Sequence, residues 1–173
     1  MSITLLTEMR ILELRNVTMA SGTDNSIDLL KGGELLLPTK NGSEIAYTRI
    51  LGDNGTNYIT NDVFDSGKVV VAFDDAFYNV QVGQKPGVIF GGTFEYTTDV
   101  LVPDVTYDAG DAVCPAMYID ADLNKRLTLV PKGTSVTPAM TGNTAGIVFV
   151  VSAAVVGLVT SVGTGEVTFK VTL

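Results

Sequence analysis

The C-terminal stretch "EVTFKVTL" (residues 166–173) alternates polar and apolar side chains without interruption. Its apolar residues occupy the odd positions from 167 to 173, and its polar residues occupy the even positions from 166 to 172. A period of two residues matches a β-strand, in which successive side chains point to opposite faces. This stretch therefore predicts a strand with one buried face and one exposed face.

Short apolar or alternating runs of the same kind recur along the chain, at 26–30, 34–38, 44–51, 68–73, 87–90, 93–97, 126–130 and 146–151. The turn signals that separate the runs are Gly32-Gly33, Asn41-Gly42, Asn54-Gly55, Ser66-Gly67, Gly91-Gly92 and Gly163-Thr164-Gly165. Glycine and Asn-Gly supply the positive φ angles that tight turns need. Many short strands with such turns are typical of sandwiches and barrels. We therefore predict an all-β fold, a β-sandwich or small β-barrel of short antiparallel strands, with a short N-terminal arm or helix.

Residues 1–20 are interpreted as an apolar N-terminal arm. Leu5, Met9 and Leu12 share one face if the segment is helical, which favours a short helix. The stretch "RILELR" (10–15) also fits a strand. Because an arm this apolar must pack on its own core or on a neighbouring subunit, these three side chains are candidate interface residues.

A domain boundary is predicted near residue 100, within "TDVLVPD" (98–104). Pro103 interrupts strand pairing there, and a new cluster of turn residues follows. This division gives the arm, a β-rich domain at 21–100 and a small β-barrel or sandwich domain at 101–173. The last two parts could also form one continuous domain.

Acidic residues exceed basic residues, and the net charge is −8. Residues 60–112 hold nine acids against two lysines, and no segment is basic. Binding to nucleic-acid phosphates or to anionic membranes is therefore not expected. Charged residues make up only 17% of the chain, below the usual quarter, which leaves surface suited to contacts between subunits.

The longest apolar run is "AGIVFVVSAAVVGLV" (145–159), shorter than the about 20 residues of a membrane-spanning helix. It is rich in valine and has no basic flank, which indicates buried strands. The start of the chain lacks the basic region of a signal peptide, and one cysteine, Cys114, permits no internal disulfide. Export to an oxidising compartment is therefore not indicated.

The inventory of catalytic side chains is poor. There is no histidine, the commonest general base and metal ligand. Cys114 has apolar neighbours in "AVCPAMYI" (112–119) and is expected in the core. Acidic pairs such as Asp74-Asp75 would point to opposite faces of a strand and are expected in solvated turns. We therefore expect no enzymatic activity and no cofactor.

The stretch "YIDADLNKRLTL" (118–129) holds the candidate metal ligands Asp120, Asp122 and Asn124, spaced like the opening of a calcium loop. An EF-hand starting at the first of them needs glycine at its sixth position and glutamate at its twelfth, where this chain has lysine and proline. The favoured interpretation is an exposed hairpin turn whose aspartates accept backbone hydrogen bonds. A looser calcium turn here, or at "DNGTN" (53–57), stays open.

The second half of the chain resembles a known family of virion proteins. "VTYDAGDAV" (105–113) enters a strand, "MYIDADLNKRLTLVPKG" (117–133) forms a hairpin, and "AGIVFVVSAA" (145–154) precedes a final hairpin. This order is similar to that of the small β-rich decoration, or cement, proteins of tailed-phage heads, over residues 105–173. The resemblance implies binding to the major capsid protein on the capsid exterior, often as a trimer, after synthesis in the host cytoplasm. It implies no catalysis and no cofactor.

We therefore expect a non-enzymatic virion structural protein that binds and stabilises an assembled phage head. One alternative is a tail component such as a tube subunit, whose acidic lumen would let DNA slide without sticking. Another is a carbohydrate- or calcium-binding β-module.

Overall fold

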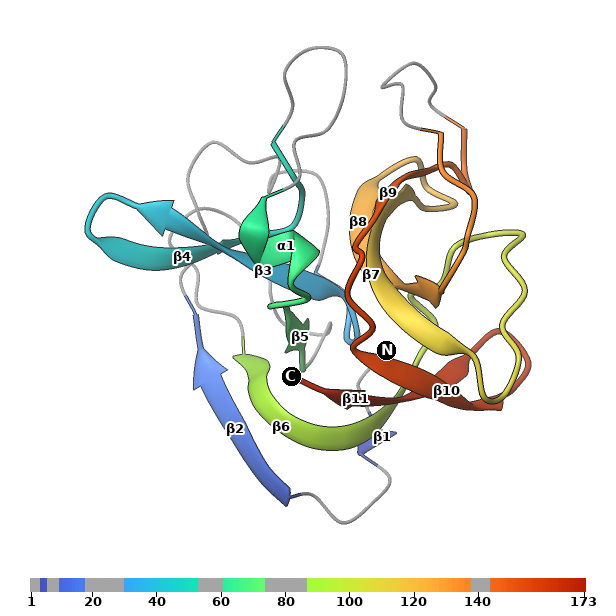
Figure 1. Ribbon diagram of the computed structural model, residues 1–173, viewed down its shortest axis with the longest axis horizontal. Coiled ribbons are helices and arrows are strands. Elements are labelled where there is room, and N and C mark those ends of the chain that lie inside the picture. Colours follow the sequence, from blue (N-terminus) through green and yellow to red (C-terminus); the bar gives the residue numbers. More distant parts are fainter. Residues whose placement is uncertain (1–3, 6–9, 18–29, 53–60, 74–86, 138–143) are drawn as a thin grey trace.

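The computed structural model describes residues 4–5, 10–17, 30–52, 61–73, 87–137 and 144–173. In these ranges the strands pair antiparallel and curl into a half-barrel, with a single short helix (Figure 1). The predicted all-β class is therefore confirmed. The run at 26–30 lies outside the described residues except for its last residue, and the candidate calcium turn at 53–57 lies wholly outside them.

The elements follow the chain as β1 (Thr4–Leu5), β2 (Arg10–Asn16), β3 (Leu35–Asn41), β4 (Glu44–Thr48), α1 (Asp62–Asp65), β5 (Val70–Ala72), β6 (Gly87–Thr98), β7 (Ala112–Ile119), β8 (Lys125–Pro131), β9 (Val148–Val151), β10 (Gly157–Val162) and β11 (Val167–Thr172). Hydrogen-bonded neighbours in the described part of the chain follow the order β4-β3-β5-β6-β11-β10-β7-β8. Outside this path, β1 and β2 pair with β6, and β9 pairs with β7. In Figure 1 the β3–β4 hairpin extends to the left, while β7, β8 and β9 curl together at the right.

Strand β6 joins the two parts of the sheet, and here the prediction of a turn at Gly91-Gly92 is wrong. The strand continues through both glycines, pairing with β5 at Val88 and Ile89 and with β11 from residue 93 onward. Gly92 has φ 113°, a conformation that favours glycine, and exchanges two backbone hydrogen bonds with Leu173 (3.2 and 3.0 Å). The glycine pair thus lets β6 continue without interruption while it pairs with β5 before these residues and with β11 after them.

The N-terminal arm is a second correction. The described residues 4–5 and 10–16 are strands paired with β6, so the favoured helix is wrong and the strand alternative for 10–15 is confirmed. Strand β6 already pairs with β5 and β11 at one edge. An extended arm satisfies the N–H and C=O groups of the other edge, whereas a helix this short is marginal alone. Met9 and the side chains of Leu5 and Leu12 lie outside what the structure describes.

Three predicted hairpins are confirmed: β3–β4 around Gly42, β7–β8, and β10–β11. In β11 the odd positions Val167, Phe169 and Val171 are buried, as the alternation predicts. Thr168, on the other face, is also buried, and its hydroxyl hydrogen-bonds that of Thr97 on β6 (2.9 Å). The outer face of the sheet is thus partly closed by cross-strand threonine pairs.

The largest core cluster draws side chains from both sides of residue 100, where a boundary was predicted. It contains Leu35, Phe64 and Ile89 from one side and Met117 and Phe169 from the other. Packing therefore extends across that position, as does the pairing of β6 with β11.

The burial of Cys114 is confirmed, and it raises the pKa of the thiol. The apolar run 145–159 forms β9 and the start of β10, as predicted, but the prediction of buried strands is wrong for Val155 and Leu158, which are exposed. No helix within the described residues is long and apolar enough to cross a membrane.

Candidate functional site

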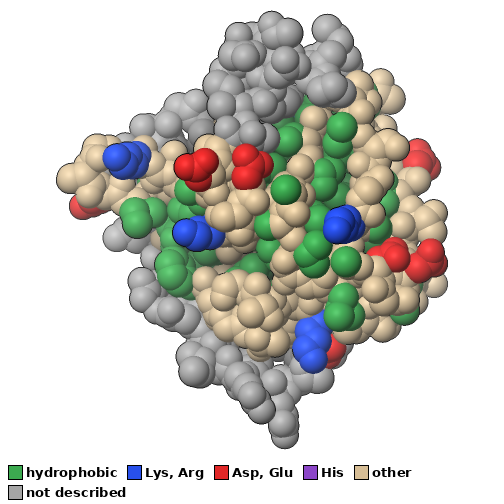
Figure 2. Space-filling model, in the orientation of Figure 1, with side chains coloured by type: hydrophobic (Ala, Val, Ile, Leu, Met, Phe, Trp, Pro, Cys, Tyr) green, Lys and Arg blue, Asp and Glu red, His purple; other side chains and the backbone are tan. Residues whose placement is uncertain are grey.

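An apolar groove of about 430 Å³ opens between the β3–β4 hairpin and the segment that precedes β10. Figure 2 shows hydrophobic side chains reaching the surface in this central region, between the β3–β4 hairpin and the curled strands β7 to β9. The groove is lined by Pro38, Ile45, Tyr47, Ser66, Gly67, Lys68, Val69, Val70, Phe90, Val155, Val156, Thr172 and Leu173.

One wall of the groove is a single face of the β3–β4 hairpin. Pro38 lies opposite Tyr47, and Lys40 lies opposite Ile45, so these four side chains share a face. The ring of Tyr47 packs edge-on against Phe90, with 6.5 Å between centroids. Ile45 is 69% exposed, the most exposed of the large hydrophobic side chains in the described residues. The wall thus combines a fixed aromatic base with an uncovered aliphatic rim.

The opposite wall depends on a close approach at Gly67. This residue follows α1, whose first turn is capped by the Asn61 side chain accepting a hydrogen bond from Phe64 N–H (3.0 Å). Gly67 has φ 70°, and a Cβ atom there would lie 2.6 Å from Val156 Cγ1 and 3.0 Å from Ala154 Cβ. Only glycine fits both the conformation and the space, and it lets Val156 pack against the helix end. Val155 then points outward, 48% exposed, at the groove rim.

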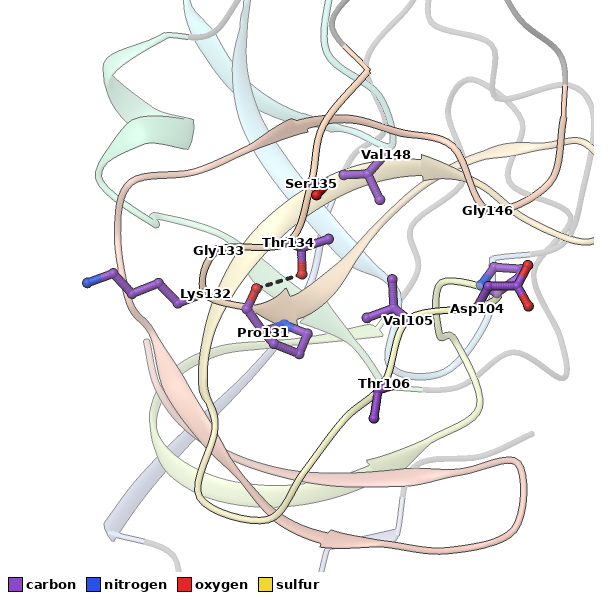
Figure 3. A pocket seen from close by; sticks show the side chains of 11 residues that line it. Asp104, Val105, Thr106, Pro131, Lys132, Gly133, Thr134, Ser135, Gly146 and Val148 are labelled. Atoms are coloured by element: carbon purple, nitrogen blue, oxygen red, sulfur yellow. Dashed lines mark hydrogen bonds between the residues drawn. The ribbon is translucent and has the colours of Figure 1, made fainter.

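A second cavity, of about 500 Å³, lies at the other end of the sheet (Figure 3). It is formed by residues 103–106, 131–135, Gly146 and Val148, and no aromatic side chain lines it. The Thr134 hydroxyl donates a hydrogen bond to the Pro131 carbonyl (2.7 Å). Lys132 extends away from the other labelled side chains (Figure 3). The hydroxyl groups that line this cavity offer polar contacts, but its lining provides no stacking platform and no converging charges.

The charged groups buried within the described residues form one network. The carboxylate of Glu34 accepts hydrogen bonds from Arg49 Nε (2.9 Å) and from Arg126 Nη1 (2.7 Å). Arg126 Nε also donates to the carboxylate of Asp120 (2.5 Å). All four side chains are buried, and two cations balance two anions. Because both charged groups of each pair are buried and no longer hydrated, removal of any one of the four side chains would leave an uncompensated buried charge.

The prediction of an exposed turn is wrong for Asp120, which is buried because its carboxylate faces Arg126 rather than the solvent at the tip of the β7–β8 hairpin. One carboxylate oxygen accepts hydrogen bonds from the N–H groups of Asp122 (2.9 Å) and Asn124 (2.8 Å), as predicted for a turn residue. The other faces Arg126. Burial raises the pKa of Asp120, but the hydrogen bonds from Arg126 and Asn124 outweigh it and hold the pKa below its usual value. Both oxygens are therefore occupied by protein donors.

The candidate ligands Asp120, Asp122 and Asn124 are thus close in sequence but face different surroundings, since Asp122 is exposed. Among the described residues no group of three acidic or cysteine side chains could hold a metal ion. Sequence reasoning missed Glu34, Arg49 and Arg126. The available signal was a charged residue next to strongly apolar runs, as in "ELLLP" (34–38) and "RLTLV" (126–130).

No protein-family model, no curated protein and no solved structure matches the chain.

Proposed function

We propose that this chain is a non-enzymatic structural protein of a phage particle, a decoration protein that binds the major capsid protein on an assembled head. The resemblance over residues 105–173 is the source of this assignment. The order of elements in that part supports it: a hairpin of β7 and β8, then β9, then a hairpin of β10 and β11. The capsid surface is the location that follows from this function.

The observation that carries the proposal is the exposed apolar groove. Ile45 and Val155 stand 69% and 48% exposed at its rim, above a base made by Tyr47 and Phe90. A contiguous apolar patch left in water on a preformed wall is typical of a surface that another protein covers. In contrast, each buried charged side chain in the described part of the chain is paired with an opposite charge in the network around Glu34. The chemistry supports binding rather than a reaction.

A decoration protein acts by mass action. A subunit that binds the assembled shell, and not its separated parts, lowers the free energy of the assembled state by an amount set by its concentration over its Kd. A homotrimer is the oligomer that the resemblance implies. The N-terminal residues Leu5, Met9 and Leu12 remain candidate contacts within such an oligomer or with the shell.

The test is to add the purified protein to heads that lack it and to examine them by cryo-electron microscopy. Added density at regular shell positions, together with slower heat release of the packaged DNA, is the expected result. Density confined to the tail, or tubes and stacked rings formed by the protein alone, would replace the proposal with a tail subunit. Heads that acquire no density anywhere would refute the decoration role.

A further inference from the structure

We propose that Leu123, at the tip of the β7–β8 hairpin, is an anchor residue whose side chain enters an apolar pocket of the major capsid protein on the assembled shell. This inference rests on the proposed function and adds to it one contact residue and the chemistry of the site that receives it.

Leu123 occupies its position at a cost in stability that nothing in the described core offsets. Its φ is 65°, in the left-handed region, where a Cβ atom is crowded by the following carbonyl oxygen. Asp104 is the other described non-glycine residue with a positive φ, but aspartate adopts this conformation several times more readily than most residues. Leu123 is also 48% exposed and packs against none of the apolar clusters of the described residues. Asparagine or glycine would suit the turn better, so the strain points to a function for the leucine side chain.

Hydrogen bonds to Asp120 hold this tip in one conformation. The Leu123 N–H donates to the Asp120 carbonyl (3.1 Å), and the Asp120 N–H donates to the Asn124 carbonyl (2.9 Å). The Asp120 carboxylate accepts hydrogen bonds from the N–H groups of Asp122 and Asn124, which flank the leucine. The same carboxylate pairs with the buried Arg126. The leucine is therefore presented by a fixed backbone, and a preorganised anchor loses little conformational entropy on binding.

The surroundings of Leu123 indicate an apolar, uncharged pocket as its partner. The exposed neighbours Asp122 and Lys125 carry opposite charges, so the tip has no net charge on a chain whose net charge is −8. Interfaces place their anchor side chains in well-packed pockets from which water is excluded. Two copies of this chain that met tip to tip would bury one leucine from each, far less than the roughly 1,000 Å² of a stable interface. The tip therefore fits as one anchor within the larger surface that a shell provides.

The same substitution at two exposed leucines tests the inference. Leu123→Asn keeps the approximate size of the side chain, removes its apolar character and suits the left-handed conformation. Leu158→Asn is the matched control, since Leu158 is 41% exposed and lies in β10 without a positive φ. Each protein is titrated onto shells assembled from the major capsid protein alone, and its melting temperature and native mass are measured.

We expect Leu123→Asn to weaken shell binding by about tenfold or more, because an anchor loses its apolar contact. Its melting temperature should rise by about 2–4 °C, because the backbone strain is relieved. Affinity and stability thus move in opposite directions, which a leucine with a merely structural role would not produce. Leu158→Asn should bind like the wild type and melt no higher than it, since asparagine is unfavourable in a strand.

Binding of Leu123→Asn that equals that of the wild type would overturn the inference. Equal weakening by both variants would show a general effect of lost surface hydrophobicity. A lower melting temperature for Leu123→Asn would make the leucine a packing residue of the hairpin, and a changed native mass would assign the tip to contacts between copies. Wild-type protein that fails to bind the shells would refute the proposed function itself, which separates the two failures.

Discussion

Glu34 and Arg126 form a buried salt bridge of 2.7 Å between Oε2 and Nη1, although 92 positions separate them in the chain. Glu34 immediately precedes β3, and Arg126 lies in β8, the last strand at the other end of the sheet order. No ladder of backbone hydrogen bonds joins these two strands in the described part of the chain. The two ends of the half-barrel thus meet through side chains, and this ion pair joins them together with the apolar core.

The first prediction concerns this bridge. Glu34→Gln should lower the free energy of unfolding by about 3–5 kcal/mol, because it leaves two buried arginines with one compensating carboxylate. Urea unfolding followed by fluorescence or circular dichroism measures the loss. Glu166→Gln, an exposed change in the β10–β11 turn, serves as the control and should cost less than about 0.5 kcal/mol. A loss for Glu34→Gln as small as that of the control would mean that the network contributes nothing to closing the barrel.

The second prediction concerns acid. The pKa of Asp120 is lower in the folded protein than its ordinary value of 3.8. Its ionised form therefore stabilises the fold above about pH 4, and this contribution disappears as the pH falls through the folded-state pKa. Asp120→Asn should cost about 3 kcal/mol at pH 7, since it unpairs a buried Arg126 charge. The difference in melting temperature between the wild type and Asp120→Asn should become smaller from pH 5 to pH 2. A constant difference over that range would contradict the stabilising role of the ionised carboxylate.

The third prediction compares two buried tyrosines. Tyr107 donates a hydrogen bond to the Leu129 carbonyl (3.0 Å), whereas the Tyr96 hydroxyl has no hydrogen-bond partner within the described residues. Tyr107→Phe should therefore cost about 1–3 kcal/mol, because it leaves a buried carbonyl unsatisfied. Tyr96→Phe removes an unsatisfied hydroxyl and should be neutral or slightly stabilising. Since the two changes delete the same atom, equal effects in chemical denaturation would show that the hydrogen bond is not the cause.

Features that depend on neighbouring residues were predictable from the sequence. The Asn41-Gly42 turn and the alternation of residues 166–173 both predicted their hairpins, because turn chemistry and strand period act over a few positions. The turn role of Asp120 followed from the same local rules. Burial of Cys114 followed from its apolar neighbours.

Features that depend on distant pairing were not predictable. Gly91-Gly92 has the composition of a turn, but Leu173 pairs with Gly92 and keeps the strand continuous. The arm has a helical pattern of apolar residues, but it forms a strand because it pairs with an edge of β6, which lies far away in the chain. Nothing near Glu34 specifies Arg126, since only closure of the sheet brings them together. The groove was missed for the same reason, because its two walls meet only in the folded molecule.

The last prediction tests how the groove wall is built, using two glycines with similar backbone angles. Gly67 has φ 70° and Gly42 has φ 64°, so alanine at either position carries the same left-handed strain of about 1–2 kcal/mol. A Cβ atom at Gly42 would meet nothing within 4 Å, whereas at Gly67 it would overlap Val156 and Ala154. Gly67→Ala should therefore cost about 1–3 kcal/mol more than Gly42→Ala, from forced repacking. Urea unfolding of both variants gives the difference. Equal costs would mean that residues 154–156 move aside freely, and the groove would then lack the fixed second wall that docking requires.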